Sequence, residues 1–234
     1  VTVAVRVSPQ NARELAPVVI AAGAEILFIQ GSIISAEHVQ QGGEPLNLKE
    51  FVGSLDVPVI AGGVYDYSTA THLMRSGVAG VIVGSGSSST VVKVPAATAI
   101  ADVAAARRDY LDETGGRYVH VLADVPIWDA DSIALAIACG ADAVMLGRNL
   151  AQASEAAANG VYWEAQAAHP RFPRGDVSKD PVVSTATALE TVLFGPSSVP
   201  YGGLNIVGGL KRMMAKCGYT DIKAFQKADL AIRD

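Results

Sequence analysis

Apolar and polar positions along the chain follow one repeated order: a mixed stretch with helical spacing, a glycine, a short apolar run and a second glycine. Clear copies of this order lie at 20–31, 74–84 and 136–147. The first glycines of the copies, Gly23, Gly77 and Gly140, suit helix ends, because the residue after a helix commonly takes left-handed dihedral angles. The intervals between them leave room for two strand–helix units each. The pattern therefore predicts a serial array of βαβ units with parallel strands.

The same pattern assigns most of the chain to helices and strands. Strands are predicted at 1–7, 25–29, 56–61, 79–83, 118–123 and 143–146. Helices are predicted at 11–22, 68–76, 96–114, 131–139, 205–217 and 221–227. Residues 33–47 are expected to form a long loop, residues 163–181 an extended surface segment, and residues 187–194 either a short strand or a short helix.

Two fold classes accommodate this array: a (β/α)8 TIM barrel and an open doubly wound sheet. The barrel is favoured because the units repeat without a break and the strands end in Gly or Asp, as a ring of active-site loops requires. About six of the eight strand–helix units are present, so the other two strands are expected upstream of Val1. We expect residues 1–234 to form a single, N-terminally incomplete barrel domain, on which the irregular segment and helices of 161–234 pack.

Composition narrows the class of protein. With 234 residues, 50% of them hydrophobic and 18% charged, the chain can bury a large core. The net charge of −5 argues against nucleic acid as the main partner, because phosphate backbones require clustered Lys and Arg. No apolar run approaches the roughly 20 residues of a membrane span. The two cysteines, Cys139 and Cys217, give no disulfide framework, which is typical of a cytoplasmic protein.

Polar residues and glycines follow the predicted strands, where a barrel would place its active site. The expected mouth is lined by Ser8, Gln30, Gly62, Gly63, the loop 84–90, Asp124, Gly147 and Arg148. The loop from Gly84 offers backbone N–H groups without side-chain obstruction, and Gly147 with Arg148 stands where barrels commonly bind phosphate. Asp124 could accept hydrogen bonds from sugar hydroxyls. These features indicate a phosphate-bearing ligand.

Each feature also has a structural explanation that the sequence leaves open. A Gly- and Ser-rich loop can be a plain connection, Asp124 a helix cap, and Arg148 a surface residue. The four histidines show no metal-ligand spacing, so no metal site is predicted. No histidine stands beside Ser87, Ser88 or Ser89 in sequence to act as a base, so these serines lack a nucleophile signature.

Several of these segments together resemble the IMP dehydrogenase and GMP reductase family. They are Ala-Gly-Gly at 61–63, the loop 84–90, Val-Leu-Ala-Asp at 121–124 and Gly-Ala-Asp-Ala-Val-Met-Leu-Gly at 140–147. Segments 29–38, 43–48, 111–119 and 205–210 resemble the actinobacterial IMP dehydrogenase-related branch that lacks the regulatory CBS domains. The resemblance covers nearly the whole chain. It implies a tetrameric barrel that binds a purine nucleoside 5′-monophosphate, uses NAD or NADP, and has a monovalent cation as a further candidate.

The resemblance also implies a role for each matching residue. It implies that Asp124, Gly84, Gly86, Ser87, Gly147 and Arg148 bind the substrate, that Gly62, Gly63 and Gln30 bind the cofactor, and that Ser89, with Thr90 beside it, occupies the position of the catalytic cysteine. In the family this cysteine adds to carbon 2 of the purine while NAD(P) exchanges hydride.

The chain departs from the family pattern at positions that matter for catalysis. Ser89 replaces the cysteine, and a serine hydroxyl is a far weaker acid than a thiol. Val125-Pro126 replaces two glycines after the aspartate, Gly63 replaces an asparagine and Arg148 a Ser or Thr, and the segment between Thr90 and Pro95 is short.

Three functions stay open on the sequence alone. The first is an NAD(P)-dependent oxidoreductase of purine nucleotides. The second is a catalytically inactive nucleotide-binding or assembly protein with the same fold. The third is another phosphate-binding barrel enzyme, because fold alone does not fix function.

Overall fold

The computed structural model describes residues 1–31, 37–38, 44–85, 94–157, 160–163, 177–179, 187–198 and 203–231. Its contacts divide the chain into two compact units. The first comprises Val1–Ser85 and Val94–Asp124, and the second includes Val125–Asp234. The single-domain organisation expected from the sequence stays a prediction.

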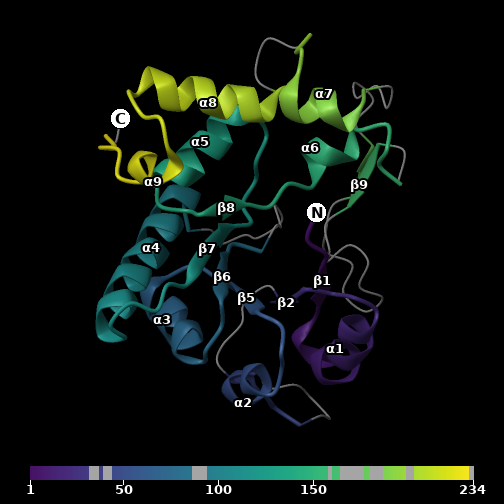
Figure 1. Cartoon of the computed structure of the whole chain (residues 1–234), viewed down its shortest axis with the longest axis vertical. Coiled ribbons are helices and arrows are strands. Elements are labelled where there is room, and N and C mark those ends of the chain that lie inside the picture. Colours follow the sequence, from purple (N-terminus) through teal and green to yellow (C-terminus); the bar gives the residue numbers. More distant parts are fainter. Residues whose placement is uncertain are drawn as a thin grey trace. The chain divides into compact units, whose positions relative to one another are not determined.

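A parallel sheet forms the centre of the first unit (Figure 1). Its strands, in spatial order, are β1 (Ala4–Val7), β2 (Ile26–Gln30), β5 (Val59–Val64), β6 (Gly80–Val83) and β7 (His120–Ala123). Every pairing between them is parallel. Each of these strands was expected within a few residues of its observed position, and the predicted parallel array is confirmed.

Helices connect these strands and lie around the outside of the sheet (Figure 1). They are α1 (Ala12–Ala21), preceded by the 3₁₀ turn η1 (Pro9–Asn11), then α2 (Leu48–Gly53), α3 (Tyr67–Arg75) and α4 (Ala96–Glu113). α2 is absent from the sequence-based prediction. Its signal is the cap: the side chain of Asn47 accepts a hydrogen bond from the backbone N–H of Glu50.

The two glycines that end helices within this unit behave as the sequence predicts. Gly23 and Gly77 have φ angles of +103° and +94°, and Gly140 of the second unit has +113°. These are left-handed backbone angles that side chains disfavour, so glycine is required for the turn from helix to strand.

The two faces of the sheet differ in their side chains, because successive residues of a strand point to opposite sides. One row, running from Ile29 through Ala61 and Val81 to Val121, is fully buried. The neighbouring row consists of Gln30, Gly62, Ile82 and Leu122 in register. Asp124, two residues beyond Leu122, continues this second face.

One hydrogen bond demonstrates that the sheet is strongly curled. The side-chain amide of Gln30, at the end of β2, donates to the carboxylate of Asp124, just beyond β7. β2 and β7 are three strand spacings apart, which is about 14 Å in a flat sheet at ~4.8 Å per step. A glutamine and an aspartate side chain cannot bridge that distance. The sheet therefore has the inward curvature of a (β/α)8 barrel, which confirms the predicted fold class.

The predicted long loop between β2 and α2 contains a short ladder. β3 (Glu37–His38) pairs antiparallel with β4 (Leu46–Asn47). Arg13 of α1 holds the end of this segment, because its guanidinium donates to Glu44 at 2.9 Å and to the carbonyl of Pro45 at 2.8 Å.

The second unit contains more helix than strand. Its elements are α5 (Ala130–Ala138), β8 (Ala143–Val144), α6 (Arg148–Ala151), β9 (Val161–Trp163), β10 (Val177–Lys179), α7 (Leu189–Phe194), α8 (Ile206–Lys216) and α9 (Ile222–Phe225). β9 and β10 pair antiparallel, so β10, near the end of the segment expected to be extended, forms a ladder with a strand at its start. The segment 187–194, for which strand and helix were both open, contains helix α7.

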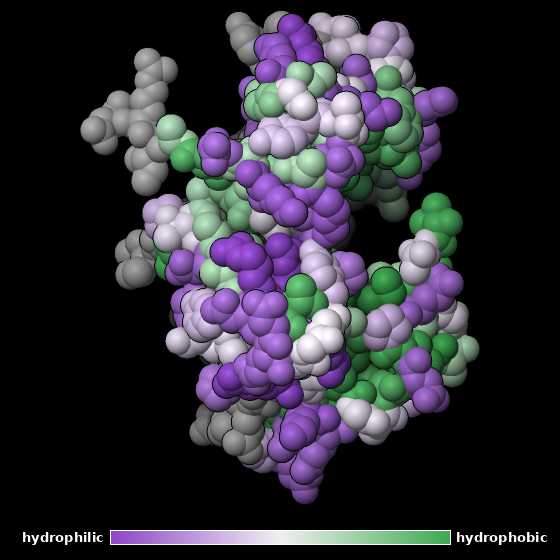
Figure 2. All heavy atoms as spheres, turned by 60° about the vertical axis from the view of Figure 1, so that its left-hand side comes forward, coloured by the Kyte–Doolittle hydropathy of each residue, from purple (hydrophilic) through white to green (hydrophobic). Residues whose placement is uncertain are grey.

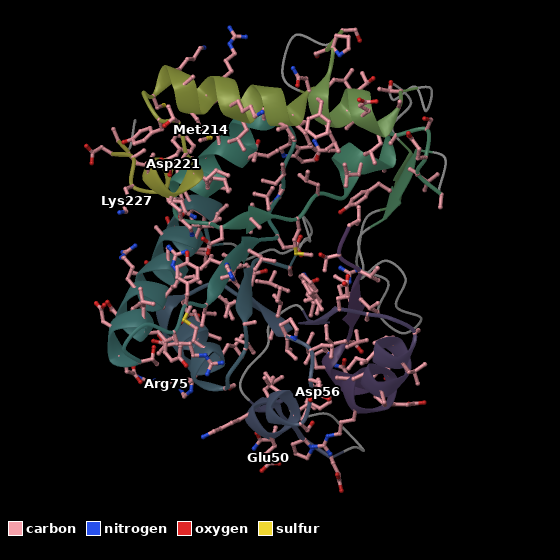
Figure 3. All side chains as sticks on the ribbon, in the orientation of Figure 1. Glu50, Asp56, Arg75, Met214, Asp221 and Lys227 are labelled. Atoms are coloured by element: carbon pink, nitrogen blue, oxygen red, sulfur yellow. The ribbon has the colours of Figure 1, made fainter. Side chains whose placement is uncertain are left out.

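Small residues and a buried methionine pack α8 against α5. Gly209 lies directly against Ala130, so that a side chain at position 209 would collide with it. Met214 is buried on the side of α8 that faces α5 (Figure 3). Lys223 of α9 forms an ion pair of 2.6 Å with Asp142, which ties this helix to the turn before β8.

The surface is mixed in character. Figure 2 shows hydrophilic side chains over much of one face, with hydrophobic side chains gathered toward its lower right. Exposed large apolar residues include Leu15 and Val18 on α1, and Trp128, Leu135 and Phe194 in the second unit. None of the helices in the described part of the chain is long and apolar enough to cross a membrane.

Candidate functional site

The ends of four strands meet at one rim of the first unit. The N–H of Gly31 donates to the carbonyl of Gly62 at 2.8 Å, and the N–H of Asp124 donates to the carbonyl of Val83 at 2.8 Å. The rim therefore brings together four residues that the sequence predicted there: Gln30, Gly62, Gly84 and Asp124.

Asp124 is the acid of this rim, and it is not a helix cap. The helix that follows, α5, is capped by Asp129, whose carboxylate accepts hydrogen bonds from the N–H of Ser132 at 2.8 Å and from its hydroxyl at 2.7 Å. The structural alternative for Asp124 is therefore excluded. Its carboxylate is part-buried and accepts a hydrogen bond from the side-chain amide of Gln30.

A chain of three side chains crosses the rim. The guanidinium of Arg6, on β1, donates to the amide oxygen of Gln30 at 3.2 Å, and the amide nitrogen of Gln30 donates to Asp124. Arg6 was not predicted as a site residue. The signal that could have found it is an arginine within the alternating apolar run 1–7, where a strand of a barrel is otherwise expected to be uncharged.

The glycine pair lies inside β5, which continues past the predicted strand end at 61 to Val64, and packing of the sheet requires the first glycine. A Cβ on Gly62 would lie 2.5 Å from both the Cβ and the carbonyl oxygen of Ile82 on the neighbouring strand. The N–H of Gly63 donates to the carbonyl of Gly31 at 3.0 Å. Contacts within the protein thus account for Gly62, Gly63 and Gln30, and these contacts by themselves do not indicate a dinucleotide cradle. Their role in binding a cofactor stays a prediction.

A hydroxyl pair stands where the Gly- and Ser-rich loop begins. Gly84 ends β6 with a φ of +92°, and its N–H donates to the carbonyl of Val64 at 3.0 Å. The next residue, Ser85, accepts a hydrogen bond of 2.9 Å from the phenol of Tyr65. Tyr65 was not predicted. Its signal is its position directly after the Gly62–Val64 strand end, where side chains reach the mouth of a barrel.

The remainder of the predicted loop lies outside the described residues. This applies to Gly86, Ser87, Ser88, Ser89 and Thr90, which include the position of the family cysteine. Their catalytic and substrate-binding roles stay predictions.

The predicted phosphate site at Gly147 and Arg148 belongs to the second unit. A Cβ on Gly147 would lie 2.6 Å from the ring of Tyr162, so a larger residue there would push the ring aside. The Arg148 guanidinium stacks over the indole of Trp128, 5.0 Å from the ring centroid. Stacking occupies the face of the guanidinium, and its hydrogen-bond donors lie in its plane. Arg148 is half-buried rather than the plain surface residue that was the alternative.

Trp128 is held by two consecutive residues of the short helix α6. Arg148 covers its ring, and the side-chain amide of Asn149 donates to its backbone carbonyl at 3.1 Å. Neither Trp128 nor Tyr162 was predicted to belong to the site. The position of Trp128 shortly after Asp124, in a chain with few aromatics, was a weak available signal, and no sequence pattern marked Tyr162.

The clearest pKa shifts lie away from both regions. Arg75 lowers the pKa of Glu113 through a bidentate hydrogen-bonded pair, and the backbone N–H of Leu189 lowers the pKa of Glu155. Figure 3 shows Arg75 at the outer end of α3. Burial raises the pKa of the Cys139 thiol, which keeps it protonated and unreactive. Within the described ranges, no three His, Cys, Asp or Glu residues gather in a way that could hold a metal ion.

The rim can therefore present a fixed carboxylate to a ligand with neighbouring hydroxyl groups. A carboxylate has about four acceptor positions, so Asp124 can accept from Gln30 and from sugar hydroxyls together. In the second unit, Arg148 provides a planar donor suited to a phosphate.

Almost the whole sequence matches the model of one protein family. Residues 1–233 match the IMP dehydrogenase / GMP reductase domain, and the chain belongs to this family. The resemblance that the sequence motifs indicated is therefore confirmed.

The relatives place the chain in a particular branch of the family. It is 60% identical, over 99% of its length and 64% of the relative's, to a protein of Mycolicibacterium smegmatis described as an uncharacterized oxidoreductase. It is 37% identical to the inosine-5′-monophosphate dehydrogenase of Haemophilus influenzae, over 58% of this chain and 27% of that enzyme. The crystal structure of an IMP dehydrogenase/GMP reductase-like protein from Corynebacterium glutamicum is also 60% identical, with a TM-score of 0.91 over 99% of this chain and 62% of that one. The chain thus spans less than two thirds of these relatives.

Proposed function

We propose that this protein binds a purine nucleoside 5′-monophosphate and acts on it as an NAD(P)-dependent oxidoreductase of purine nucleotide metabolism. The observation that carries the proposal is the hydrogen-bonded carboxylate of Asp124 at the strand-end rim of a family barrel. Oxidoreductase is also the description of its 60% identical relatives.

In this proposal each group has a defined task. Asp124 accepts hydrogen bonds from the ribose hydroxyls and so fixes the sugar. Arg148 binds the phosphate through the edge of its guanidinium, while Trp128 holds the face. Tyr65 and Ser85 orient the start of the loop that faces the base. NAD or NADP, which family membership supports, would exchange hydride with the purine. We also expect a homo-oligomer.

A second candidate is a nucleotide-binding protein without turnover, and a sequence observation favours it. Ser89 stands where the family has its cysteine. A thiol can be deprotonated near neutral pH, whereas a serine hydroxyl needs an activating base. In this candidate the barrel and the sugar-binding carboxylate are kept, and covalent catalysis is lost.

Two measurements on one preparation separate the candidates. Calorimetry with GMP and with IMP tests binding, and the absorbance of NAD(P)H in the presence of either nucleotide tests turnover. Binding with turnover supports the oxidoreductase, and binding without turnover supports the second candidate. If neither nucleotide binds, both candidate functions are wrong.

A matched pair of variants tests the role of Asp124. Asp124→Asn keeps the shape of the side chain but removes its charge, and it should weaken nucleotide binding by about 10-fold or more, because hydrogen bonds to charged groups contribute roughly 1.5–3 kcal/mol. Asp112→Asn removes an exposed carboxylate of α4 and should leave the affinity unchanged. Equal affinities of the two variants would contradict the assignment of Asp124.

A further inference from the structure

We infer that Arg6 is a positioning residue that fixes the orientation of the Gln30 amide and thereby makes Asp124 selective for ribose over 2′-deoxyribose. This inference rests on the proposed nucleotide binding and deepens it. It comes from the chain of hydrogen bonds that runs from β1 to the residue after β7.

A side-chain amide has two ends, and only its partners decide which way it faces. The carbonyl oxygen of Gln30 accepts hydrogen bonds, and its NH₂ group donates them. The two orientations have nearly the same shape, so packing alone does not choose between them.

The two neighbours of Gln30 choose the orientation unambiguously. The guanidinium of Arg6 can only donate, so it faces the amide oxygen, at 3.2 Å. The ionised carboxylate of Asp124 can only accept, so it faces the amide nitrogen. Arg6 and Asp124 therefore require the same orientation of the Gln30 amide, and each supports the contact that the other makes.

This arrangement places the positive charge of Arg6 near the carboxylate through the Gln30 amide. In a direct pair, a guanidinium would take two carboxylate positions at once in a bidentate contact. Here Gln30 occupies the Oδ2 side of Asp124 with one donor, and the charge of Arg6 polarises the amide between them. Gln30 thus holds the carboxylate through one of its about four acceptor positions.

Loss of Arg6 would release the amide. Only Asp124 would then hold the amide. With its oxygen left without the donor, Gln30 could swing away from the carboxylate and leave it without a fixed neighbour. The carboxylate would move from the position at which both ribose hydroxyls reach it. A ribonucleotide would lose more than a 2′-deoxyribonucleotide, because it makes one more hydrogen bond there.

The test compares the affinities of GMP and 2′-deoxy-GMP by calorimetry. We expect the unaltered protein to prefer GMP by about 10-fold. Arg6→Met keeps the aliphatic stem and removes the donors, and it should reduce the preference to about 2-fold or less. Arg6→Lys can only donate, so it should keep most of the preference. Arg6→Glu can only accept, which favours the wrong orientation of the amide, and it should abolish the preference.

A control and a double variant distinguish positioning from a general structural effect. Arg13→Met removes an exposed arginine of α1 that pairs with Glu44, and it should leave the preference unchanged. Gln30→Met removes the residue through which Arg6 acts. The Arg6→Met/Gln30→Met protein should therefore show the same preference for GMP over 2′-deoxy-GMP as the Gln30→Met protein. Thermal melting of each variant checks that the fold is kept.

The outcomes separate this inference from the proposed function. If the protein binds neither nucleotide, both are overturned. If it binds both equally, or if Arg6→Met keeps the preference, nucleotide binding stands and the role of Arg6 is wrong. If Arg6→Lys loses the preference as completely as Arg6→Met does, the inferred role of Arg6 is also wrong.

Discussion

Two glycines that end apolar runs, Gly62 in the first unit and Gly147 in the second, look alike in the sequence but are required for different reasons. At Gly62 the obstacle to a side chain is the neighbouring strand itself, including the backbone oxygen of Ile82 at 2.5 Å. At Gly147 the obstacle is the ring of Tyr162 at 2.6 Å. The first glycine allows two strands of a curled sheet to approach, and the second accommodates an aromatic side chain. The same sequence pattern therefore does not identify the same kind of site.

The largest expected effect is a difference in stability between the alanine variants of these two glycines. Gly62→Ala should destabilise the protein by about 3 kcal/mol, because backbone atoms cannot move aside, and Gly147→Ala by about 1 kcal/mol, because a ring can shift. Urea unfolding measures both free energies. The double variant Gly147→Ala/Tyr162→Leu should recover most of the stability lost at 147. If Gly62→Ala proves as mild as Gly147→Ala, the contrast between strand and ring is wrong.

The next prediction concerns the ligand groups that the two regions are proposed to bind. Arg148→Gln removes the charge that would bind phosphate, so it should lower the affinity for GMP by about 10-fold. It should leave the binding of guanosine, which lacks the phosphate, unchanged. Asp124→Asn should weaken both ligands, because both have the ribose. Calorimetry with the two ligands tests this division, and an equal loss of guanosine binding in Arg148→Gln would contradict it.

A smaller effect is expected from the residue that holds Arg148. A cation–π contact contributes roughly 0.5–1 kcal/mol at exposed sites. Trp128→Ala should therefore weaken GMP binding by a few-fold, and Trp128→Phe, which keeps an aromatic face, should restore part of the loss. The first unit provides the control. Tyr118, which lies under the guanidinium of Arg107 at 5.1 Å, makes the same kind of contact away from the rim, and Tyr118→Leu should leave the affinity unchanged.

Much of the fold could be predicted from the sequence because its signals are local. The glycines after helices and the short apolar runs gave the parallel strands of the first unit and the major helices of both units. Helix α2 was missed because it has only six residues and its signal is a single Asn47 cap. The pair β9 and β10 was missed because its two strands lie far apart in sequence and the intervening residues have no periodicity.

The site was less predictable, because its contacts join distant parts of the chain. Gln30 and Asp124 could each be assigned to the rim as strand ends, but their hydrogen bond depends on the curvature of the sheet. In the sequence, Arg6 is only an unexpected charged residue in a strand, and its contact with Gln30 is visible only in the structure. Trp128 and Tyr162 fall in segments without a clear pattern, and their contacts with Arg148 and Gly147 follow from tertiary structure alone.

The smallest predicted effects compare two carboxylates, one in each unit, whose pKa values are lowered by different partners. Glu113 pairs with the guanidinium of Arg75, and Glu155 accepts from the N–H of Leu189. A lowered pKa means that the ionised form stabilises the fold. This contribution is fully present above the unfolded-state pKa and is lost as the pH falls through the folded-state value.

Melting temperatures of Glu113→Gln and Glu155→Gln between neutral and acidic pH test this. Each variant should melt slightly below the unaltered protein at neutral pH, and the difference should vanish in acid. Salt near 1 M should reduce the effect at Glu113 more than that at Glu155, because an exposed ion pair is screened while a backbone hydrogen bond is less so. Identical salt responses would indicate that both carboxylates act in the same way.

The hydrogen bond between Gln30 and Asp124 joins residues 94 positions apart, and this separation ties binding to the completion of folding. Closing so long a segment costs chain entropy that only the finished array of strands and helices can offset. In a partly folded chain, Gln30 and Asp124 would not yet be in contact, so the carboxylate proposed to bind the sugar would not be held in place. Ligand affinity should therefore appear late during refolding, after helical circular dichroism has recovered, and the ligand should stabilise the last contacts that form.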